Sequence, residues 1–165
     1  MAIDQQIFKQ AMAQWASGVT VVTTRLPSGE LKGMTASSFT SVSMNPYLIL
    51  VCVAKKLYTH EVLLQSNDFA VNILNHNQAD IAQIFAGMRP EITDRFGHIG
   101  FTTAKTGSPI LPNVSAWFDC NKYQTIDSGD HTIFIGEVVT AYGMTDSSPL
   151  IYFNRQWGSF APKME

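Results

Sequence analysis

The sequence predicts a mainly β protein: an antiparallel β-barrel with a few peripheral helices, built as one domain over residues 1–165. Strand-like segments number about seven and dominate the chain, and the few helical segments do not alternate with them. That order argues against a doubly wound α/β sheet. Several strands are apolar on both faces, which fits a barrel covered by helices or by a second subunit. We therefore expect a homodimer.

Three segments carry helix signals. They are residues 4–15, residues 59–64 and about residues 77–86. Apolar residues of the first segment fall on one face, and Gly18 ends it. Thr59 is a favoured N-cap residue and is expected to start the second helix. In the third segment apolar residues recur at i, i+3, i+4 and i+7, and Gly87 follows.

The predicted strands are segments rich in β-branched and aromatic residues, or continuous apolar runs. In chain order they are residues 19–24, 34–42, 47–53, 69–74, 115–123, 131–142 and 150–153. Residues 26–30 form a turn signal between the first two strands. Residues 89–112 are rich in turn-forming residues and are expected to form a loop, with one short strand near residues 100–103.

Composition and missing motifs exclude several classes of function. The net charge is −2 and the basic residues are scattered, so no basic stripe for nucleic acid is present. The sequence shows no signal peptide and no apolar run of about 20 residues, so we expect no membrane partner and a cytoplasmic location. It contains no Walker A loop, no GxGxxG and no GxSxG motif. The four histidines share no metal-binding spacing, so no metal site is predicted. Cys52 and Cys120 are expected to be reduced thiols in the core.

The most informative segment is residues 33–41, GMTASSFTS, which places small and hydroxyl side chains in a predicted strand. Small side chains let a flat ligand approach the backbone, while hydroxyl and N–H groups can serve phosphate or ring-carbonyl oxygens. Lys55 follows the next apolar strand and can supply positive charge to the same phosphate. Composition alone leaves a merely solvated, Ser/Thr-rich edge strand as the alternative.

Two further segments place possible ligand-binding groups near predicted strand ends. In Gly129-Asp130-His131 the glycine allows a tight turn, and His131 at the barrel rim can donate to a carboxamide or a phosphate. A lone histidine there can equally be a solvated surface residue. Residues 149–157 combine aromatic side chains with Arg155, and they can border a slot for a ring, or form core or a dimer interface.

Taken in order, these segments resemble the short-chain flavin reductase family, the reductase components of two-component flavin-dependent monooxygenases. The matching segments cover nearly the whole chain: residues 15–24, 33–43, 46–53, 69–74, the helix with Phe85, residues 95–96, 129–138 and 149–152. The resemblance implies an antiparallel Greek-key split barrel of the FMN-binding type, usually a homodimer.

The resemblance also implies a set of flavin-binding residues. The Thr-Ala-Ser-Ser segment would line the flavin, the end of the following strand would reach the ring and phosphate, and His131 would orient the nicotinamide. The expected binding residues are Thr35, Ala36, Ser37, Ser38, Phe39, Cys52, Val53, Ala54, Lys55, Thr59, Phe96, His131 and Tyr152. Leu57 occupies the place of a small hydroxyl residue that the family often has near the phosphate. The phosphate contact is therefore left to Lys55, Lys56 or Thr59.

The activity implied is reduction of FMN or FAD by NADH or NADPH, with hydride transfer from nicotinamide C4 to flavin N5 and no side chain acting as acid or base. Reduced flavin would supply a flavin-dependent monooxygenase. Three alternatives remain at this point: a non-enzymatic FMN-binding electron carrier on the same fold, a pyridoxamine-phosphate-oxidase-like enzyme, and a barrel that binds no ligand. The sequence leaves open which flavin and which nucleotide are used, and whether the flavin is tightly bound or diffuses.

Overall fold

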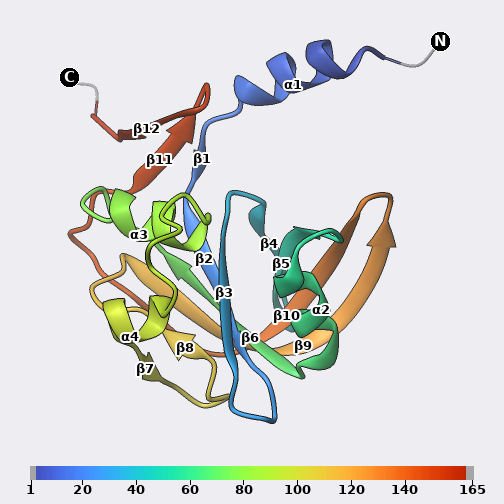
Figure 1. The fold of residues 1–165 in the computed structure, drawn as a ribbon, viewed down its shortest axis with the longest axis vertical. Helices are drawn as coiled ribbons and strands as arrows, with labels where there is room; N and C mark the ends of the chain where they lie inside the picture. The colour runs from blue at the N-terminus through green and yellow to red at the C-terminus, as the bar shows by residue number, and fades with distance from the viewer. Residues whose placement is uncertain (1–2, 163–165) are drawn as a thin grey trace.

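The computed structural model describes residues 3–162, and a curled seven-stranded antiparallel sheet forms its body (Figure 1). The strand order is β3-β2-β6-β9-β10-β5-β4, and every neighbouring pair is antiparallel. The strands are β2 (Thr20–Arg25), β3 (Leu31–Ala36), β4 (Phe39–Met44), β5 (Tyr47–Ala54), β6 (Asp68–Ile73), β9 (Ala116–Ser128) and β10 (His131–Gly143). The mainly β, antiparallel architecture predicted from the sequence is confirmed.

The barrel is open along one seam. Its two edge strands, β3 and β4, are consecutive in the chain and are joined only by Ser37 and Ser38. The prediction of one strand over residues 34–42 was therefore wrong, because the chain leaves one edge of the sheet at Ser37 and enters the other at Phe39. Ser38 holds this break in place through hydrogen bonds to the backbone of Cys52 on β5.

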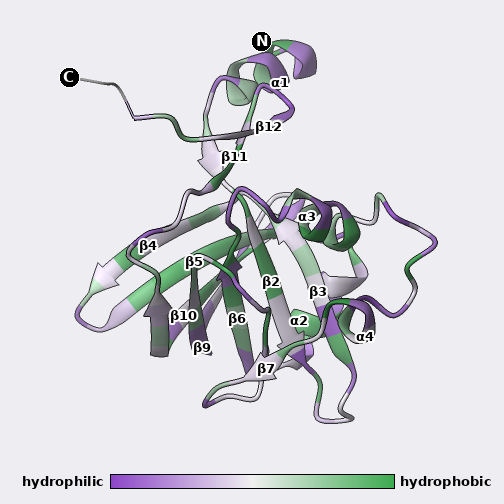
Figure 2. Ribbon diagram, turned by 90° about the vertical axis from the view of Figure 1, so that its left-hand side faces the viewer, coloured by the Kyte–Doolittle hydropathy of each residue, from purple (hydrophilic) through white to green (hydrophobic). Residues whose placement is uncertain are grey.

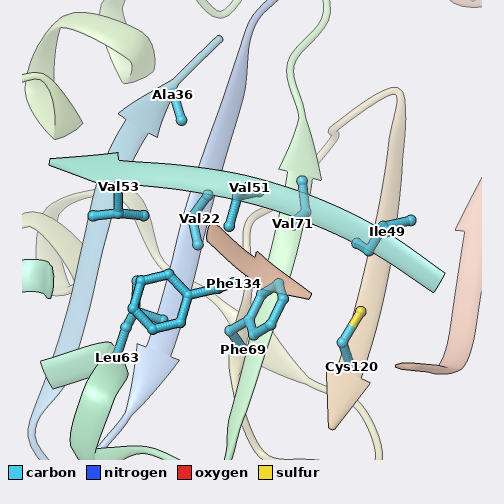
Figure 3. Close-up of a cluster of buried hydrophobic side chains, with 10 residues drawn as sticks. All are labelled: Val22, Ala36, Ile49, Val51, Val53, Leu63, Phe69, Val71, Cys120 and Phe134. Carbon is cyan, nitrogen blue, oxygen red and sulfur yellow. The ribbon is translucent and has the colours of Figure 1, made fainter. Parts of the chain in front are cut away.

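The core fills the inside of the curled sheet. Figure 3 shows side chains from several strands and from α2 (Tyr58–Gln65) meeting there. The cluster comprises Val22, Ala36, Ile49, Val51, Val53, Leu63, Phe69, Val71, Cys120 and Phe134. A second cluster lies between the sheet and α3 (Ala79–Phe85), and it includes Val21, Leu74 and Phe85. These two clusters explain why several strands are apolar on both faces.

The first helix, α1 (Gln5–Ala13), projects away from the barrel (Figure 1). Asp4 caps it, because its carboxylate accepts from the backbone N–H of Gln6 at 2.8 Å and of Ile7 at 3.2 Å. No residue of α1 is buried, and Ile7 is 57% exposed. Figure 2 shows both hydrophobic and hydrophilic stretches on α1, which stands apart from the sheet together with β11 and β12. Within residues 3–162, nothing therefore covers the predicted apolar face of this helix.

Two predictions about the other helices need correction. Thr59 is not the N-cap of α2: Leu57 takes that position without a side-chain hydrogen bond, and Thr59 lies within the first turn. Residues 89–112 were expected to be loop with one short strand near residues 100–103, but they also contain α4 (Arg95–Ile99), whose N-cap Asp94 accepts from Gly97 N at 2.9 Å. The same region holds β7 (Thr102–Thr103) and β8 (Pro109–Ile110). Five residues are too few to show helical periodicity, which explains why α4 was missed.

A second, three-stranded sheet forms beside the barrel from β1 (Ser17–Gly18), β11 (Leu150–Phe153) and β12 (Gln156–Ser159). The strand β12 was not predicted. A two-residue turn joins β11 to β12, and both of its residues have positive φ, 47° at Asn154 and 62° at Arg155. None of the helices described in residues 3–162 has the length and apolar character needed to cross a membrane.

Candidate functional site

Three adjoining clefts follow β3 and the two serines that link it to β4. The edge cleft has a volume of about 830 Å³ and lies where α2, α3 and α4 meet β3. The middle cleft, of about 170 Å³, shares Thr35 and Ala86 with the edge cleft. The serine cleft, of about 480 Å³, shares Ser37 and Tyr152 with the middle cleft. Because neighbouring clefts share lining residues, they adjoin one another along β3 and the two serines, and the three together are called here the split groove.

The serine cleft is built on the seam of the barrel. The Ser38 hydroxyl donates to the carbonyl of Cys52 at 2.8 Å and accepts from its N–H at 3.2 Å. Burial raises the pKa of the Cys52 thiol, so this group is neutral at physiological pH. Ser37 is exposed at the cleft, and Phe39 packs on Phe118 with ring centroids 5.7 Å apart. This part of the groove therefore offers hydroxyl and backbone groups and no charge from β3, β4 or β5.

Small side chains shape the middle cleft. The Thr35 hydroxyl donates to the carbonyl of Ala82 at 2.6 Å, which fastens α3 against β3. Ala36 is buried beside it, and Tyr152 packs on Trp157 with ring centroids 5.2 Å apart. The Thr35 hydroxyl is therefore engaged with the helix, and this residue presents mainly its backbone and methyl group to a ligand.

The edge cleft is lined by two cations, Lys32 and Arg95, whereas the serine cleft has one, Arg155. Lys32 on β3 lies 2.9 Å from Glu30 and places its ammonium 5.0 Å from the centre of the Tyr58 ring. Arg95 on α4 is half-buried, and within residues 3–162 its side chain makes no ion pair and no hydrogen bond. A half-buried guanidinium without a partner is suited to an anionic ligand.

A glycine allows the wall of the edge cleft to form. A Cβ on Gly33 would lie 2.7 Å from Phe85 Cε1 and 3.3 Å from Phe96 Cζ. The absence of a side chain at position 33 thus lets both rings pack directly on β3. These two rings meet edge to face with centroids 5.2 Å apart, so they join α3 and α4 into one wall.

The structure brings most of the predicted binding residues together. The split groove is lined by Thr35, Ala36, Ser37, Ser38, Phe39, Cys52, Thr59, Phe96 and Tyr152. Four predicted residues do not line it. The side chain of Val53 is fully buried in the core, and Ala54 pairs with His131 across β5 and β10. Lys55 is exposed, and its ammonium lies 2.5 Å from Asp127.

His131 begins β10 outside the split groove. Its Nδ1 donates to Asp130 Oδ1 at 2.7 Å, which leaves Nε2 for another partner. This hydrogen bond is the main reason why the pKa of the Asp130 carboxyl lies below its ordinary value. Within the described part of the chain, no group of three or more His, Cys, Asp or Glu residues could hold a metal ion.

Sequence reasoning did not include Lys32, Tyr58 and Arg95 in the predicted site, although all three line the edge cleft. For Arg95 a signal existed, because it precedes Phe96 in a segment that matches the family pattern. For Lys32 no local signal exists, because its neighbour Tyr58 comes from a helix that tertiary folding places against β3.

The open antiparallel barrel, with a groove along its seam, places the protein in the split-barrel class. The family model described as "Flavin reductase like domain" matches residues 12–161. The chain therefore belongs to the flavin reductase-like family, as the resemblance implied.

Three similar proteins illustrate the family. A "Probable flavin reductase" of Rhizobium meliloti is 39% identical over 161 residues, which are 98% of this chain and 50% of that protein. The reductase component of the flavin-dependent trigonelline monooxygenase of Acinetobacter baylyi is 43% identical over 130 residues, 79% of this chain and 41% of its own. This chain thus spans half or less of the length of these two relatives.

The third is a solved structure, the NADH:FAD oxidoreductase of Streptomyces globisporus C-1027 in complex with NAD and FAD fragments. It is 32% identical, covers 100% of this chain and 99% of its own, and superimposes with a TM-score of 0.90. The split-barrel fold class expected from the sequence is confirmed by this likeness.

Proposed function

We propose that this chain is a single flavin reductase domain that reduces FMN or FAD with NADH or NADPH. The observation that carries the proposal is the split groove. It runs along the seam of the barrel and joins a stretch in which Ala36, Ser37 and Ser38 leave space at the backbone, with Arg155 at its far wall, to a stretch with two cations, Lys32 and Arg95. A flavin has the same order of parts: a flat ring, then a ribityl chain and a phosphate.

We place the flavin with its ring in the serine and middle clefts and its phosphate in the edge cleft, which has two cations where the serine cleft has one. The serine and middle clefts suit the ring, because Ala36 and Ser37 leave space at the backbone. The edge cleft suits the phosphate, because Lys32 and Arg95 line it together with Thr59. Leu57 lines the same cleft and cannot donate a hydrogen bond to the phosphate. Lys32 therefore supplies the positive charge for the phosphate in this chain. Lys55 is bound to Asp127 and is not needed for that role.

The chemistry supplied by a bound flavin is acceptance of a hydride at N5 from C4 of the nicotinamide. The protein contributes binding and alignment. β3 is an edge strand, so backbone N–H groups on its outer side have no strand partner and can donate to a ligand that becomes more electron-rich. The hydrogen bonds between Ser38 and Cys52 keep the floor of the serine cleft rigid. No side chain of the groove is required as an acid or base.

His131 is the proposed contact for the nicotinamide nucleotide. It lies opposite Ala54, two residues beyond Cys52 along β5, at the end of the strand that lines the serine cleft. Asp130 accepts from Nδ1 and thereby orients the ring with Nε2 unengaged. Support for nucleotide binding comes from the solved relative in complex with NAD and FAD fragments.

A homodimer and a monooxygenase partner complete the proposal. Ile7 and Phe8 on α1, and Trp15 just after it, are more than half exposed, and a second copy would cover them. A relative is the reductase component of a flavin-dependent monooxygenase, which supports delivery of reduced flavin to such an enzyme. The cytoplasmic location stays a prediction. Sedimentation equilibrium of the full chain and of Phe8→Asp tests the dimer, which the charge should weaken.

Anaerobic stopped-flow absorbance near 450 nm tests the activity, with purified chain, each flavin and each nucleotide. Protein-dependent bleaching is the expected result. His131→Ala should raise KM for the nucleotide and leave flavin affinity unchanged, whereas the matched His76→Ala should change neither, because His76 lies on another exposed turn. Flavin that binds and is not bleached by either nucleotide would favour an electron carrier. A chain that binds neither flavin would refute the proposal.

A further inference from the structure

The proposed function leaves one buried histidine without a role. His60 on α2 is 7% exposed and does not line the split groove. Its Nε2 lies 2.8 Å from the hydroxyl of Thr132 on β10, and its ring meets Phe134 edge to face with centroids 5.8 Å apart. Figure 1 shows α2 beside the β9–β10 hairpin. The hydrogen bond therefore joins two elements distant in sequence, in a place shielded from water.

The bond holds the residue next to the proposed nucleotide contact. Thr132 directly follows His131 at the start of β10. Successive side chains of a strand point to opposite faces, so Thr132 and Phe134 face inward toward α2, whereas His131 faces outward and is half-exposed. Because the two residues share one stretch of backbone, any displacement of Thr132 moves the His131 ring as well.

The start of β10 has support from the sheet on one side only. β6 pairs with β9 no further than Asn121, so the remainder of β9 pairs with β10 alone. On the other side of β10, the pairing with β5 ends at Ala54, opposite His131. One further backbone bond, from Lys55 N to Asp130 O at 3.0 Å, lies beyond that point. The hairpin tip that carries His131 therefore projects past most of the sheet.

Two side-chain contacts tie residues 124–132 to other elements within the described chain. One is the ion pair between Lys55 and Asp127, whose side chains are 38% and 80% exposed. Ion pairs so open to water contribute little. The other is the bond between His60 and Thr132, which is stronger in its buried surroundings. The buried bond is therefore the firmer of the two contacts.

The helix that carries His60 is itself fixed. Val62 and Leu63 are buried on α2, and Leu63 belongs to the core of the barrel. At the far end of α2 the Lys122 ammonium of β9 donates to the carbonyls of Leu63 at 3.0 Å and Leu64 at 2.9 Å. Side chains on such a rigid support hold their partners at a defined position.

Stability alone does not call for a polar pair at this place. Two apolar side chains of similar shape can replace a buried hydrogen-bonded pair with little or no loss of stability. A hydrogen bond differs in that it is satisfied only within a narrow range of distance and angle. The pair of His60 and Thr132 thus selects one position of β10 relative to α2.

We propose that His60 is a positioning residue for the reduction of flavin: through Thr132 it holds the start of β10, and with it His131, in the place where the nicotinamide nucleotide binds. The inference rests on the proposed function, because it takes from it the contact between His131 and the nucleotide. His60 itself contacts neither ligand in this arrangement.

Thr132→Val tests the inference, because it keeps the shape of the side chain and removes the hydroxyl. With saturating FMN, KM for the nucleotide that supports turnover should rise by about three- to tenfold, the effect of losing one hydrogen bond. Kd for FMN, measured by fluorescence without nucleotide, should stay within about twofold. Thr132→Ser keeps the hydroxyl and should leave KM close to that of the unaltered chain.

A double variant shows whether the effect passes through His131. His131→Ala alone should raise KM for the nucleotide. Adding Thr132→Val to it should raise KM no further, because no imidazole is left to position. A general disturbance of the fold would instead multiply KM by the same factor in both backgrounds.

Two more variants separate position from stability. His60→Leu combined with Thr132→Val makes the pair apolar, so the urea midpoint should recover from its value in Thr132→Val while KM stays raised. Asp127→Asn is the matched control, because it breaks the exposed ion pair of the same hairpin and should change neither KM nor the midpoint. His60→Leu alone removes the bond from the other element and should raise KM as Thr132→Val does, so the test does not depend on the folding of one variant.

Four results would overturn the inference while the proposed function stands. They are an unchanged KM in both Thr132→Val and His60→Leu, the same factor with and without His131, a KM in Thr132→Ser as high as in Thr132→Val, and recovery of KM together with stability in the apolar pair. An unchanged KM in His131→Ala would instead refute the proposed nucleotide contact, and the inference with it.

Discussion

The side chain of Ser38 engages both backbone groups of Cys52: its hydroxyl donates to the carbonyl at 2.8 Å and accepts from the N–H at 3.2 Å. A third, longer bond of 3.3 Å joins Cys52 N to the backbone carbonyl of Ser38. These bonds fix the point where the chain crosses from one edge of the open barrel to the other. The proposed floor of the flavin ring site is thus held by two bonds of one hydroxyl group and by one backbone bond.

Replacing Ser38 by alanine should lower the free energy of unfolding by about 1–2 kcal/mol, because the Cys52 carbonyl loses its hydroxyl donor in a partly buried place. Urea denaturation measures the change. Ser37→Ala is the control: Ser37 is exposed and its hydroxyl makes no hydrogen bond within residues 3–162, so a change within about 0.5 kcal/mol is expected. Equal losses in the two variants would show that the hydroxyl bonds of Ser38 do not hold the seam.

The parts of the fold that could be predicted are those with a residue pattern of their own in the sequence. The continuous apolar run at residues 47–53 and the β-branched and aromatic residues of 131–142 predicted β5 and β10 within a residue or so. Both are local patterns produced by burial on a sheet. The break at Ser37 and Ser38 has no such signal, because Met34 to Val42 favours strand throughout. It arises from tertiary hydrogen bonds to β5.

The same distinction applies to the site. The hydroxyl-rich segment was recognised because small residues in a strand are unusual in composition, and Thr35 to Phe39 do line the split groove. The cation was predicted at Lys55 from its place after a strand. In the structure the β9–β10 hairpin presents Asp127 to that lysine, while Lys32 and Arg95 reach the groove. Which charge faces a cleft depends on neighbours distant in sequence.

Gly33→Ala should destabilise the protein and disturb the edge cleft together. The new Cβ would lie 2.7 Å from Phe85 Cε1 and 3.3 Å from Phe96 Cζ, so both rings must move. Overpacking of this kind costs about 1–3 kcal/mol, and displacement of α4 should also weaken flavin binding. Urea denaturation and a flavin titration measure the two effects. Gly18→Ala is the matched control, because no heavy atom lies within 4 Å of the place that a Cβ on Gly18 would take.

If Gly33→Ala and Gly18→Ala both kept the stability and the flavin affinity of the unaltered chain, the rings of Phe85 and Phe96 would not be held against β3 as described. A loss of stability with unchanged flavin affinity would separate the packing of α3 and α4 from the site, and would weaken the assignment of the edge cleft.

Arg155→Gly should make the β11–β12 hairpin more stable. Arg155 has a φ of 62°, a left-handed conformation that costs a residue with a side chain about 1–2 kcal/mol relative to glycine. Part of this gain is offset by the greater freedom of glycine in the unfolded chain, which leaves about 0.5 kcal/mol. Hydrogen exchange of the amides in β11 and β12 should slow accordingly.

Asn154→Gly provides the comparison for that hairpin. Its φ of 47° is also positive, but asparagine tolerates this region, so the exchange rates should change less than in Arg155→Gly. Faster exchange in Arg155→Gly would mean that contacts of the Arg155 side chain outweigh the backbone strain.

The two thiols should react with iodoacetamide at very different rates and with a defined pH dependence. Burial raises the pKa of Cys52, so the reactive thiolate is scarce at neutral pH, and the rate should keep rising with pH beyond the range of an ordinary exposed thiol. Cys120 is fully buried, and burial together with the nearby Asp119 raises its pKa still further. Mass spectrometry of timed samples follows both sites. Cys120 should be labelled only when urea unfolds the chain, which makes it an internal control.

Because Cys52 lines the serine cleft, FAD or FMN should slow its labelling and leave that of Cys120 unchanged. Labelling of Cys52 that is indifferent to saturating flavin would place the flavin ring elsewhere in the groove.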